Sequence, residues 1–555
     1  MIVPASVDGP ILVCSEGLSF WGGVDPTNGV IIDAHHPQHG QSLVGKLVLM
    51  PTSRGSCSGS GVLLDLAMNG LAPAALIFRE EEGILTLGAL IATLMFDCPV
   101  AVLRLPTAEY ELLSTKPRAT LSKERITADG LSLTLPGLSE DYLELTEYER
   151  AMLDGAQGLA VKRAMQTICT MASVQGATKL VEVSRAHIDG CIYAAPAYLT
   201  FAQTMKTMGA KVKVPTTTNA ISVDYSNWRN QGVALDFGIP ASELAEAYVQ
   251  MGVKSNFTCA PYQAEDAPSE DEYIGWSESN AVIYANTVLG ARTEKHPDFF
   301  DLFIALTGRA PLAGVYLDDH RVAQIIIDVE LPEGHDDAVW PMLGWLVGHI
   351  ASDRIPLLTG LEGAVLCADD LRAICASFGT TSAAPMLHIA GVTPEASRPA
   401  TRDAKRVSIS HTDFVRAWGA FNSGPAKIDL VALGSPHFSL DETRAFAGQM
   451  KHLHRNPGTA VVITLGRETK KAAQDEGLIS QLTAKGIKVI SDICWCTLTE
   501  PVFPPDARNL MTNSGKYAHY APGLTGRTVR FGGLAECADA AATGLAKVGL
   551  PKWLT

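Results

Sequence analysis

The chain has 555 residues, which predicts about three or four domains of ordinary size. Apolar residues make up 47% of it and charged residues 19%, a composition that excludes a disordered chain. There are 44 Lys and Arg against 59 Asp and Glu, giving a formal net charge of −15. This balance argues against a nucleic-acid partner, which needs a basic surface. The 11 cysteines are an odd number, which argues against a secreted disulfide framework.

No segment of the sequence resembles a targeting signal or a membrane-spanning helix. The beginning, MIVPASVDGP, lacks the basic and apolar regions of a signal peptide. The most apolar stretch, Leu85–Phe96, would cover about 18 Å as a helix, which is shorter than the roughly 30 Å of a bilayer core. We therefore predict a cytoplasmic protein without a membrane partner, present as a monomer or a small homo-oligomer.

Short apolar runs bounded by Gly or Pro alternate with helical patterns in the first part of the chain. Strands are expected at residues 45–50, 74–78, 99–105 and 131–136, with helices at 61–69 and 85–96. A turn-rich junction at 137–142 follows and provides the expected hinge. It separates a first domain, residues 1–140, from the remainder, residues 141–555.

The remainder opens with a helix-start signal. Thr146 is placed as N-cap with Glu149 three residues on, a capping box whose helix is expected to run to Gly176. Strands are then expected at 179–184, 210–215, 427–433, 460–464 and 487–490, with a helix at 201–209. This alternation predicts an α/β chain with mostly parallel sheets.

The first candidate site is the segment PTSRGSCSGSG, residues 51–61, between an expected strand and an expected helix. Its glycines permit tight turns, and the amides at a helix N-terminus favour an anion. The serine hydroxyls and Arg54 would complete a site for a carboxylate or phosphate. A Gly- and Ser-rich connector without a ligand is the alternative. The Gly-Lys-Ser/Thr of a Walker loop is missing.

A second candidate site surrounds Cys259, which precedes Ala-Pro on a stretch that must be extended. An isolated cysteine is typically a small buried hydrophobe. However, Glu278, Asn280, Asn286 and Arg292 follow on otherwise apolar sequence, where polar groups need partners or a ligand.

A third candidate site follows the expected strand at 487–490. Cys494 and Cys496 lie beyond its carboxyl end, the edge at which open α/β sheets bind ligands. Their spacing is too close for the usual zinc knuckle. Lys516 and His519 lie on an expected Gly-broken loop and would hold an anion or shuttle a proton, unless the loop is merely solvated.

Two histidine segments are less informative. His187 and Asp189 form either an acid–base pair or a turn with an exposed histidine. His35, His36 and His39 indicate a polar loop rather than a metal site, because the segment is rich in Gly and Pro.

Together, these motifs resemble the aconitase X family, an outlying branch of the aconitase superfamily. PTSRGSCSGSG resembles the active-site loop of its small swivelling domain. Seven further segments resemble parts of its large domain, in the expected order: LTEYERAMLDGAQG, AHIDG, TCAPY, SESNAV, GSPHFSL, SDIC and TNSGKYAHY. The resemblance implies an aconitase-like α/β fold in which a swivelling β/α domain, residues 1–140, is fused to a large multi-lobed catalytic domain, residues 141–555.

The family resemblance also implies an activity. One class is split into two subunits and dehydrates a phosphorylated mevalonate. The other is a fused chain that dehydrates a hydroxylated amino acid, cis-3-hydroxy-L-proline, to a pyrroline-2-carboxylate. The fused order found here favours the second class, a hydro-lyase. The alternatives are a mevalonate 5-phosphate dehydratase, which would need more basic residues than Arg54, and a non-catalytic Fe–S redox or regulatory protein, which would need four cysteine ligands.

By the same resemblance, cysteines hold an Fe–S cluster. Cys259 and Cys494 match ligand positions of the family. Cys57 is the preferred third ligand, and Cys496 and Cys537 are the alternatives. Ser435 stands where the split class carries a cysteine. The loss of one thiolate ligand implies a 2Fe–2S cluster rather than 3Fe–4S or 4Fe–4S.

The resemblance further assigns Ser56 as the catalytic base, acting as an alkoxide. A free hydroxyl is far too weak a base, so the loop amides and Arg54 would have to stabilise its anion. Arg54, Ser58, Lys516 and Asn280 are the candidates for binding the substrate.

Overall fold

The computed structural model describes all residues except 34–35, 55–56, 138–142 and 499. Apart from Gly137, the expected hinge at 137–142 therefore lies outside the described residues, as does the domain boundary expected at residue 140. The chain divides into a first unit, Met1–Thr216 with Glu246–Val253 and His296–Gly314, and a second unit, Thr217–Ala245 with Lys254–Lys295 and Val315–Thr555. No helix among the described residues is long and apolar enough to cross a bilayer.

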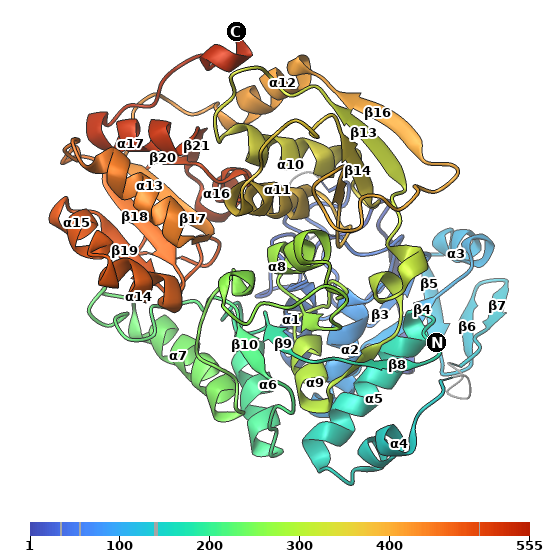
Figure 1. The fold of residues 1–555 in the computed structure, drawn as a ribbon. Helices are drawn as coiled ribbons and strands as arrows, with labels where there is room; N and C mark the ends of the chain where they lie inside the picture. The colour runs from blue at the N-terminus through green and yellow to red at the C-terminus, as the bar shows by residue number, and fades with distance from the viewer. Residues whose placement is uncertain (34–35, 55–56, 138–142, 499) are drawn as a thin grey trace. The chain divides into compact units, whose positions relative to one another are not determined.

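A seven-stranded mixed sheet carries the N-terminal part of the first unit (Figure 1). In spatial order its strands are β4 (Ala101–Arg104), β3 (Ala75–Phe78), β2 (Leu47–Met50), β1 (Val7–Val13), β5 (Arg118–Leu121), β6 (Arg125–Ala128) and β7 (Leu131–Thr134). The first four run parallel, and β5 to β7 continue the sheet antiparallel. Strands β2 and β3 are buried along their whole length, as is typical of parallel strands covered on both faces.

Two apolar helices connect these parallel strands, α1 (Gly59–Met68) and α2 (Ile84–Phe96). They pack closely, since a Cβ added to Gly88 of α2 would lie 2.5 Å from the carbonyl oxygen of Ser60. The helices and strands expected in this part of the chain are confirmed, and the loop of residues 51–58 leads from β2 into α1.

The helix expected from Thr146 to Gly176 is wrong in its extent. Thr146 and Glu149 do form the expected capping box. The helix nevertheless stops after α4 (Glu147–Asp154) and restarts as α5 (Leu159–Val174). Gly155 and Gly158 between them adopt φ values of 96° and 95°, a left-handed conformation that ends an α-helix.

The strand expected at residues 210–215 is also wrong. The helix before it is confirmed as α6 (Pro196–Thr207). The backbone N–H of Val212 donates to Met251 O at 2.9 Å, and that of Lys213 donates to Ala305 O at 2.8 Å. Because these partners are the ends of helices rather than a neighbouring strand, no ladder forms. The next strand is β10 (Thr216–Thr218).

Parallel sheets dominate the second unit, which confirms the predicted α/β class. One sheet has the order β19 (Lys488–Ser491), β18 (Ala460–Leu465), β17 (Leu430–Phe438), β20 (Asn509–Thr512) and β21 (Thr528–Phe531), drawn in orange to red in Figure 1. The other has the order β15 (His388–Ile389), β14 (Pro356–Thr359), β13 (Ile325–Val329) and β16 (Lys405–Ile409).

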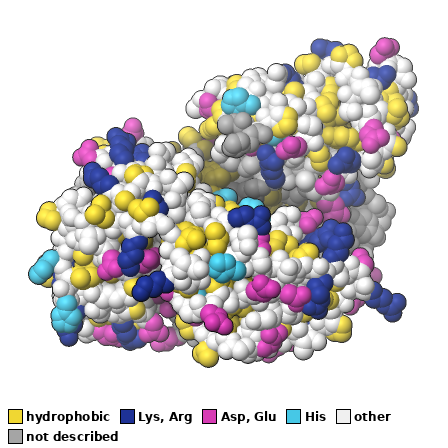
Figure 2. All heavy atoms as spheres, turned by 90° about the horizontal axis from the view of Figure 1, so that it is seen from above, with side chains coloured by type: hydrophobic (Ala, Val, Ile, Leu, Met, Phe, Trp, Pro, Cys, Tyr) yellow, Lys and Arg dark blue, Asp and Glu magenta, His cyan; other side chains and the backbone are white. Residues whose placement is uncertain are grey.

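Helices α13 (Leu440–Met450), α15 (Leu478–Ala484) and α17 (Leu534–Thr543) bury the larger of these two sheets. Their apolar side chains form one core with the inward residues of β17 and β18. Other helices that matter below are α8 (Ser279–Tyr284), α10 (Val339–Ile350), α11 (Ala368–Thr381) and α16 (Gly515–Thr525). On the face shown in Figure 2, Lys and Arg are interspersed with Asp and Glu.

Candidate functional site

Three thiols meet in the second unit. Cys494 and Cys496 lie just beyond the carboxyl end of β19, and Cys259 precedes a short 3₁₀ helix, Pro261–Gln263. The Cys494 thiol is hydrogen-bonded to the thiols of both Cys259 and Cys496, so it is the central one. Ala220 packs against them, and Cys259 and Cys494 are buried.

The three thiols differ in pKa because of the hydrogen bonds between them. The bonds from Cys259 and then Cys496 lower the pKa of Cys494 well below its usual value, despite burial. Burial and the bond to Cys494 raise the pKa of Cys259, and the bond to Cys494 together with burial raises the pKa of Cys496. The negative charge therefore rests on Cys494. Among the described residues, no group of three or more His, Cys, Asp or Glu is arranged to hold a metal ion.

His437, buried at the end of β17, ties the thiol segments together. Its backbone N–H donates to Cys259 Sγ at 3.3 Å, and its Nε2 lies 2.9 Å from the carbonyl oxygen of Ile493. A carbonyl only accepts, so Nε2 carries the proton. Nδ1 then accepts from the Thr258 hydroxyl, 3.2 Å away. Burial lowers the pKa of His437, which keeps the ring neutral in this role.

A buried ion pair faces the thiols. Lys516 Nζ lies 2.8 Å from Glu278 Oε1, and these residues are only 8% and 5% exposed. Burial alone would lower the pKa of Lys516, but Glu278 and the thiols of Cys496 and Cys494 raise it well above its usual value. The ammonium is therefore permanently charged beside the thiol cluster.

Helix ends place these two charged residues. The Glu278 carboxylate caps α8 by accepting from the backbone N–H of Ala281 at 2.9 Å. Lys516 lies in the first turn of α16, whose N-cap Ser514 accepts from the N–H of Tyr517 at 3.0 Å. The Gly-broken loop expected here is therefore wrong, because the Ser514 cap starts a helix at Gly515. His519 also lies on this helix and accepts from Trp345 Nε1 at 3.2 Å.

Asn280 joins the first turn of α8 to the cysteine loop. Its Nδ2 donates to the carbonyl oxygen of Cys259 at 3.0 Å, and its Oδ1 accepts from the Tyr262 hydroxyl at 2.7 Å. Tyr262 in turn stacks on Tyr284, with ring centroids 4.1 Å apart. Asn280 and Lys516, both expected to bind substrate, thus lie in one site with Cys259 and Cys494.

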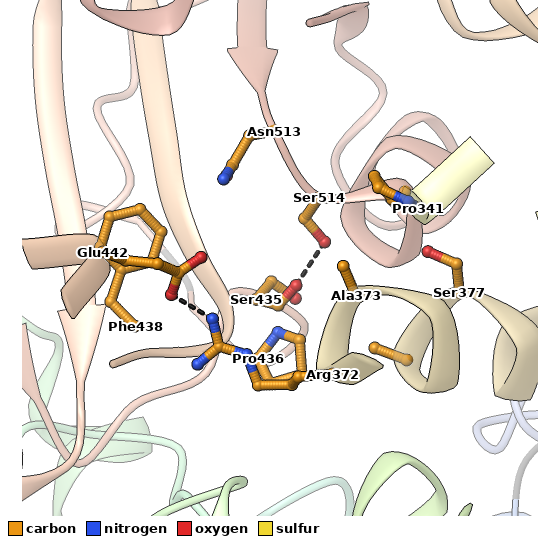
Figure 3. A pocket seen from close by; sticks show the side chains of 12 residues that line it. Pro341, Arg372, Ala373, Ser377, Ser435, Pro436, Phe438, Glu442, Asn513 and Ser514 are labelled. Carbon is orange, nitrogen blue, oxygen red and sulfur yellow. Dashed lines mark hydrogen bonds and ion pairs between the residues drawn. The ribbon is translucent and has the colours of Figure 1, made fainter. Parts of the chain in front are cut away.

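A cavity of about 30 Å³ lies beside Ser435 (Figure 3), large enough for a water molecule. The hydroxyls of Ser435 and Ser377 line it, and within the described structure neither has a hydrogen-bond partner. Arg372 spans its floor, paired with Glu442 and donating to the carbonyl oxygen of His437 at 2.9 Å. The cavity therefore reaches the backbone that holds Cys259.

A wider groove of about 970 Å³ opens from the same region, with room for a small organic substrate. Tyr262, Tyr284 and Arg372 contribute to its wall.

The loop of residues 51–61 belongs to the first unit. Ser56 lies outside the described residues, whereas Cys57 is buried and Ser58 is the N-cap residue of α1. The guanidinium of Arg54 is paired with Glu16 at 3.2 Å and with Asp33 at 3.0 Å.

The remaining sequence candidates are placed as follows. Cys537 is part of the apolar core under the five-stranded sheet. His187 is buried on β9 (Ala186–Ile188), and burial lowers its pKa to about 3, so the exposed-histidine alternative is wrong. His35 lies outside the described residues. The Glu278–Lys516 pair and the role of His437 were not predicted, because no local pattern joins residues so far apart in the sequence.

Family models match nearly all of the chain. They are described as the aconitase X swivel domain (residues 1–128), first domain (142–319), second domain (323–419) and third domain (428–543).

Individual relatives are similar over different lengths. A cis-3-hydroxy-L-proline dehydratase of Pseudomonas aeruginosa is 45% identical over 100% of this chain and 98% of its own. One of Hypocrea jecorina is 42% identical over 100% and 96%. The large subunit of a phosphomevalonate dehydratase of Methanothermobacter thermautotrophicus is 32% identical over 70% of this chain and 96% of its own. The crystal structure of Thermococcus kodakaraensis aconitase X in its holo form covers 72% of this chain and 100% of its own, with a TM-score of 0.66 and 28% identity.

Proposed function

The chain belongs to the aconitase X family, and on that basis we propose that it is a hydro-lyase that dehydrates cis-3-hydroxy-L-proline to a pyrroline-2-carboxylate. One observation carries the proposal. The two relatives named for this reaction align with the whole chain, including the fused swivel domain, whereas the phosphomevalonate dehydratase large subunit aligns with 70% of it.

The thiol cluster fits the cysteine-bound Fe–S cluster expected of this family. Thiolates are the ligands such clusters need, and Cys494 already has a lowered pKa beside Cys259 and Cys496. We propose these three cysteines as the ligands because their thiols are in contact. Cys496 thereby replaces Cys57, the third ligand preferred from the sequence, and Cys57 becomes the alternative. Ser435, where the split class carries one of its three cysteine ligands, supports a 2Fe–2S cluster. When bound, the iron would supply Lewis acidity for departure of the C3 hydroxyl.

Residues of the chain would remove the proton and bind the substrate. Ser56 would take the proton from Cα, so that a Cα–Cβ double bond forms as the C3 hydroxyl leaves. The amides at the start of α1, just after Ser58, would stabilise the Ser56 alkoxide. Arg54 and Ser58 are proposed to bind the substrate carboxylate. Arg54 would then exchange its present pairing with Glu16 and Asp33 for that carboxylate.

Lys516 and Asn280 have a second role beside the substrate binding expected from the sequence. Each already has protein partners, so we propose that they organise the thiol site as well as facing the substrate. The fixed positive charge of Lys516 stabilises the Cys494 thiolate, and Asn280 fixes the carbonyl of Cys259.

The test is a comparison of two substrates. Anaerobically purified protein is incubated with cis-3-hydroxy-L-proline and, separately, with mevalonate 5-phosphate, and loss of water is followed by mass spectrometry. Turnover of the hydroxyproline alone is expected. Turnover of the phosphorylated substrate alone, or of neither, would refute the proposal. The Ser56→Ala variant should lose most of the activity and keep only a residual rate, and full activity in that variant would remove Ser56 from the mechanism.

A further inference from the structure

The residues that follow Ser56 are held by a buried tyrosine of the first unit. The hydroxyl of Tyr198, on α6, lies 3.1 Å from the carbonyl oxygen of Ser58 and 3.1 Å from Asp298 Oδ2. The same carbonyl accepts the first bonds of α1, from the N–H groups of Gly61 at 3.2 Å and Val62 at 3.3 Å. Tyr198 therefore binds at the point where the loop becomes a helix.

Asp298 completes this contact. It is fully buried and is hydrogen-bonded to the Ser58 side chain as well as to Tyr198. Burial, followed by the charge of Asp301, raises the pKa of Asp298 to about 7. A tyrosine hydroxyl has one proton to donate, while both its neighbours are oxygens. The Tyr198 hydroxyl donates this proton to Asp298 Oδ2 or to the carbonyl oxygen of Ser58, both of which accept it.

Packing reinforces the hydrogen bonds. A Cβ added to Gly61 would lie 2.2 Å from atoms of the Tyr198 ring, so only glycine permits this approach. Ser60 adds a hydrogen bond within the segment, with its Oγ 3.0 Å from the carbonyl oxygen of Cys57, and lies 3.4 Å from the carbonyl oxygen of Asp298. The segment 57–61 is thus held both by Tyr198 and by the residues around Asp298.

We infer that Tyr198 and Asp298 are positioning residues for the dehydration, because they hold the carbonyl of Ser58 and the first turn of α1, which follow the proposed base Ser56 directly in the chain. The inference rests on the proposed function. A displacement of about 1 Å in a reacting group is enough to slow a reaction about a hundredfold. The contacts of Tyr198 and Asp298 with Ser58, which we call the clamp, lie two residues from the proposed base, so their loss is expected to lower kcat.

The test uses Tyr198→Phe, which removes the hydroxyl and keeps the ring. The matched control is Tyr248→Phe, since the Tyr248 hydroxyl is also buried in the first unit and donates to a carbonyl, that of Gly190, at 3.2 Å. Amide hydrogen exchange of residues 57–64 is measured on the holoenzyme, together with kcat and KM for cis-3-hydroxy-L-proline.

We expect Tyr198→Phe to speed exchange of this segment by about threefold or more and to lower kcat about tenfold to a hundredfold with KM little changed. The control should leave both exchange and kcat as in the wild type. Unchanged exchange would overturn the clamp, whatever the activity. Faster exchange with unchanged kcat would overturn its role in the reaction.

A second variant separates positioning from general destabilisation. In a Ser56→Ala background, Tyr198→Phe should cost no further activity, because the clamp acts through Ser56. A further loss as large as in the wild type would refute the inference. If the wild-type protein does not dehydrate hydroxyproline at all, the proposed function fails, while the exchange experiment still decides whether the clamp exists.

Discussion

The buried pair of Glu278 and Lys516 gives the strongest stability prediction. Its members lie 2.8 Å apart and are almost inaccessible to water, so replacing Lys516 with Met leaves a carboxylate buried and without its counter-charge. Breaking a buried pair in this way costs about 3–5 kcal/mol. Glu278 keeps the N–H of Ala281, at 2.9 Å, which favours the lower end of that range. The melting temperature should fall by roughly 5 °C.

The double variant makes the argument specific. In Glu278→Gln/Lys516→Met both charges are gone, so we expect most of the lost stability to return, with a coupling of about 2–3 kcal/mol in the double-mutant cycle. The assay is thermal and denaturant unfolding of the four proteins.

An exposed pair in the same unit serves as the control. Arg444 Nε lies 2.8 Å from Glu476 Oε2, but these side chains are 46% and 37% exposed. Arg444→Met should therefore cost less than about 1 kcal/mol. Additive losses in the Glu278–Lys516 cycle would refute the reasoning, because they would mean that each charge is stabilised without the other.

Three further predictions follow from single sites. Asp298 binds its proton more tightly in the folded protein than in the unfolded chain, so it destabilises the fold progressively as pH rises from about 4, where the unfolded chain loses this proton, to about 7, where the folded protein loses it. The stability that Asp298→Asn gains over the wild type should therefore grow between about pH 4 and 7 and then level off at no more than about 4 kcal/mol, and a difference independent of pH would contradict this. Cys496→Ser should lower the iron content of anaerobically purified protein while the exposed Cys367→Ser leaves it unchanged, and equal iron in both would exclude Cys496 as a ligand. Gly61→Ala should speed exchange at residues 57–64 as Tyr198→Phe does, since its methyl group displaces the tyrosine ring; wild-type exchange would show that the packing is not needed.

Much of the fold was predictable because parallel strands buried on both faces are nearly continuous apolar runs. β3, β18 and the start of β17 are such apolar runs in the sequence. The failures were at boundaries. Glycine conformations decided where α4 ended, and the Ser514 cap decided that α16 began where a loop was expected.

The site was predictable only where a residue type indicated its own chemistry. The motifs singled out Cys259 and Cys494, which the structure brings into contact together with Cys496, one of the residues weighed as a third ligand. Glu278 and Lys516 are 238 positions apart, and only the fold brings them together. Tyr198 had no signal at all, because its role depends on a glycine and a carbonyl in a distant loop.

The measurement that tests the account most directly follows iron and activity together. Anaerobic protein is treated with a chelator for increasing times, and at each time the iron content, the visible absorption and the rate of cis-3-hydroxy-L-proline dehydration are determined. We predict that the rate falls in proportion to the iron and the absorption. A colourless, iron-free protein that still dehydrates hydroxyproline at the full rate would contradict the account.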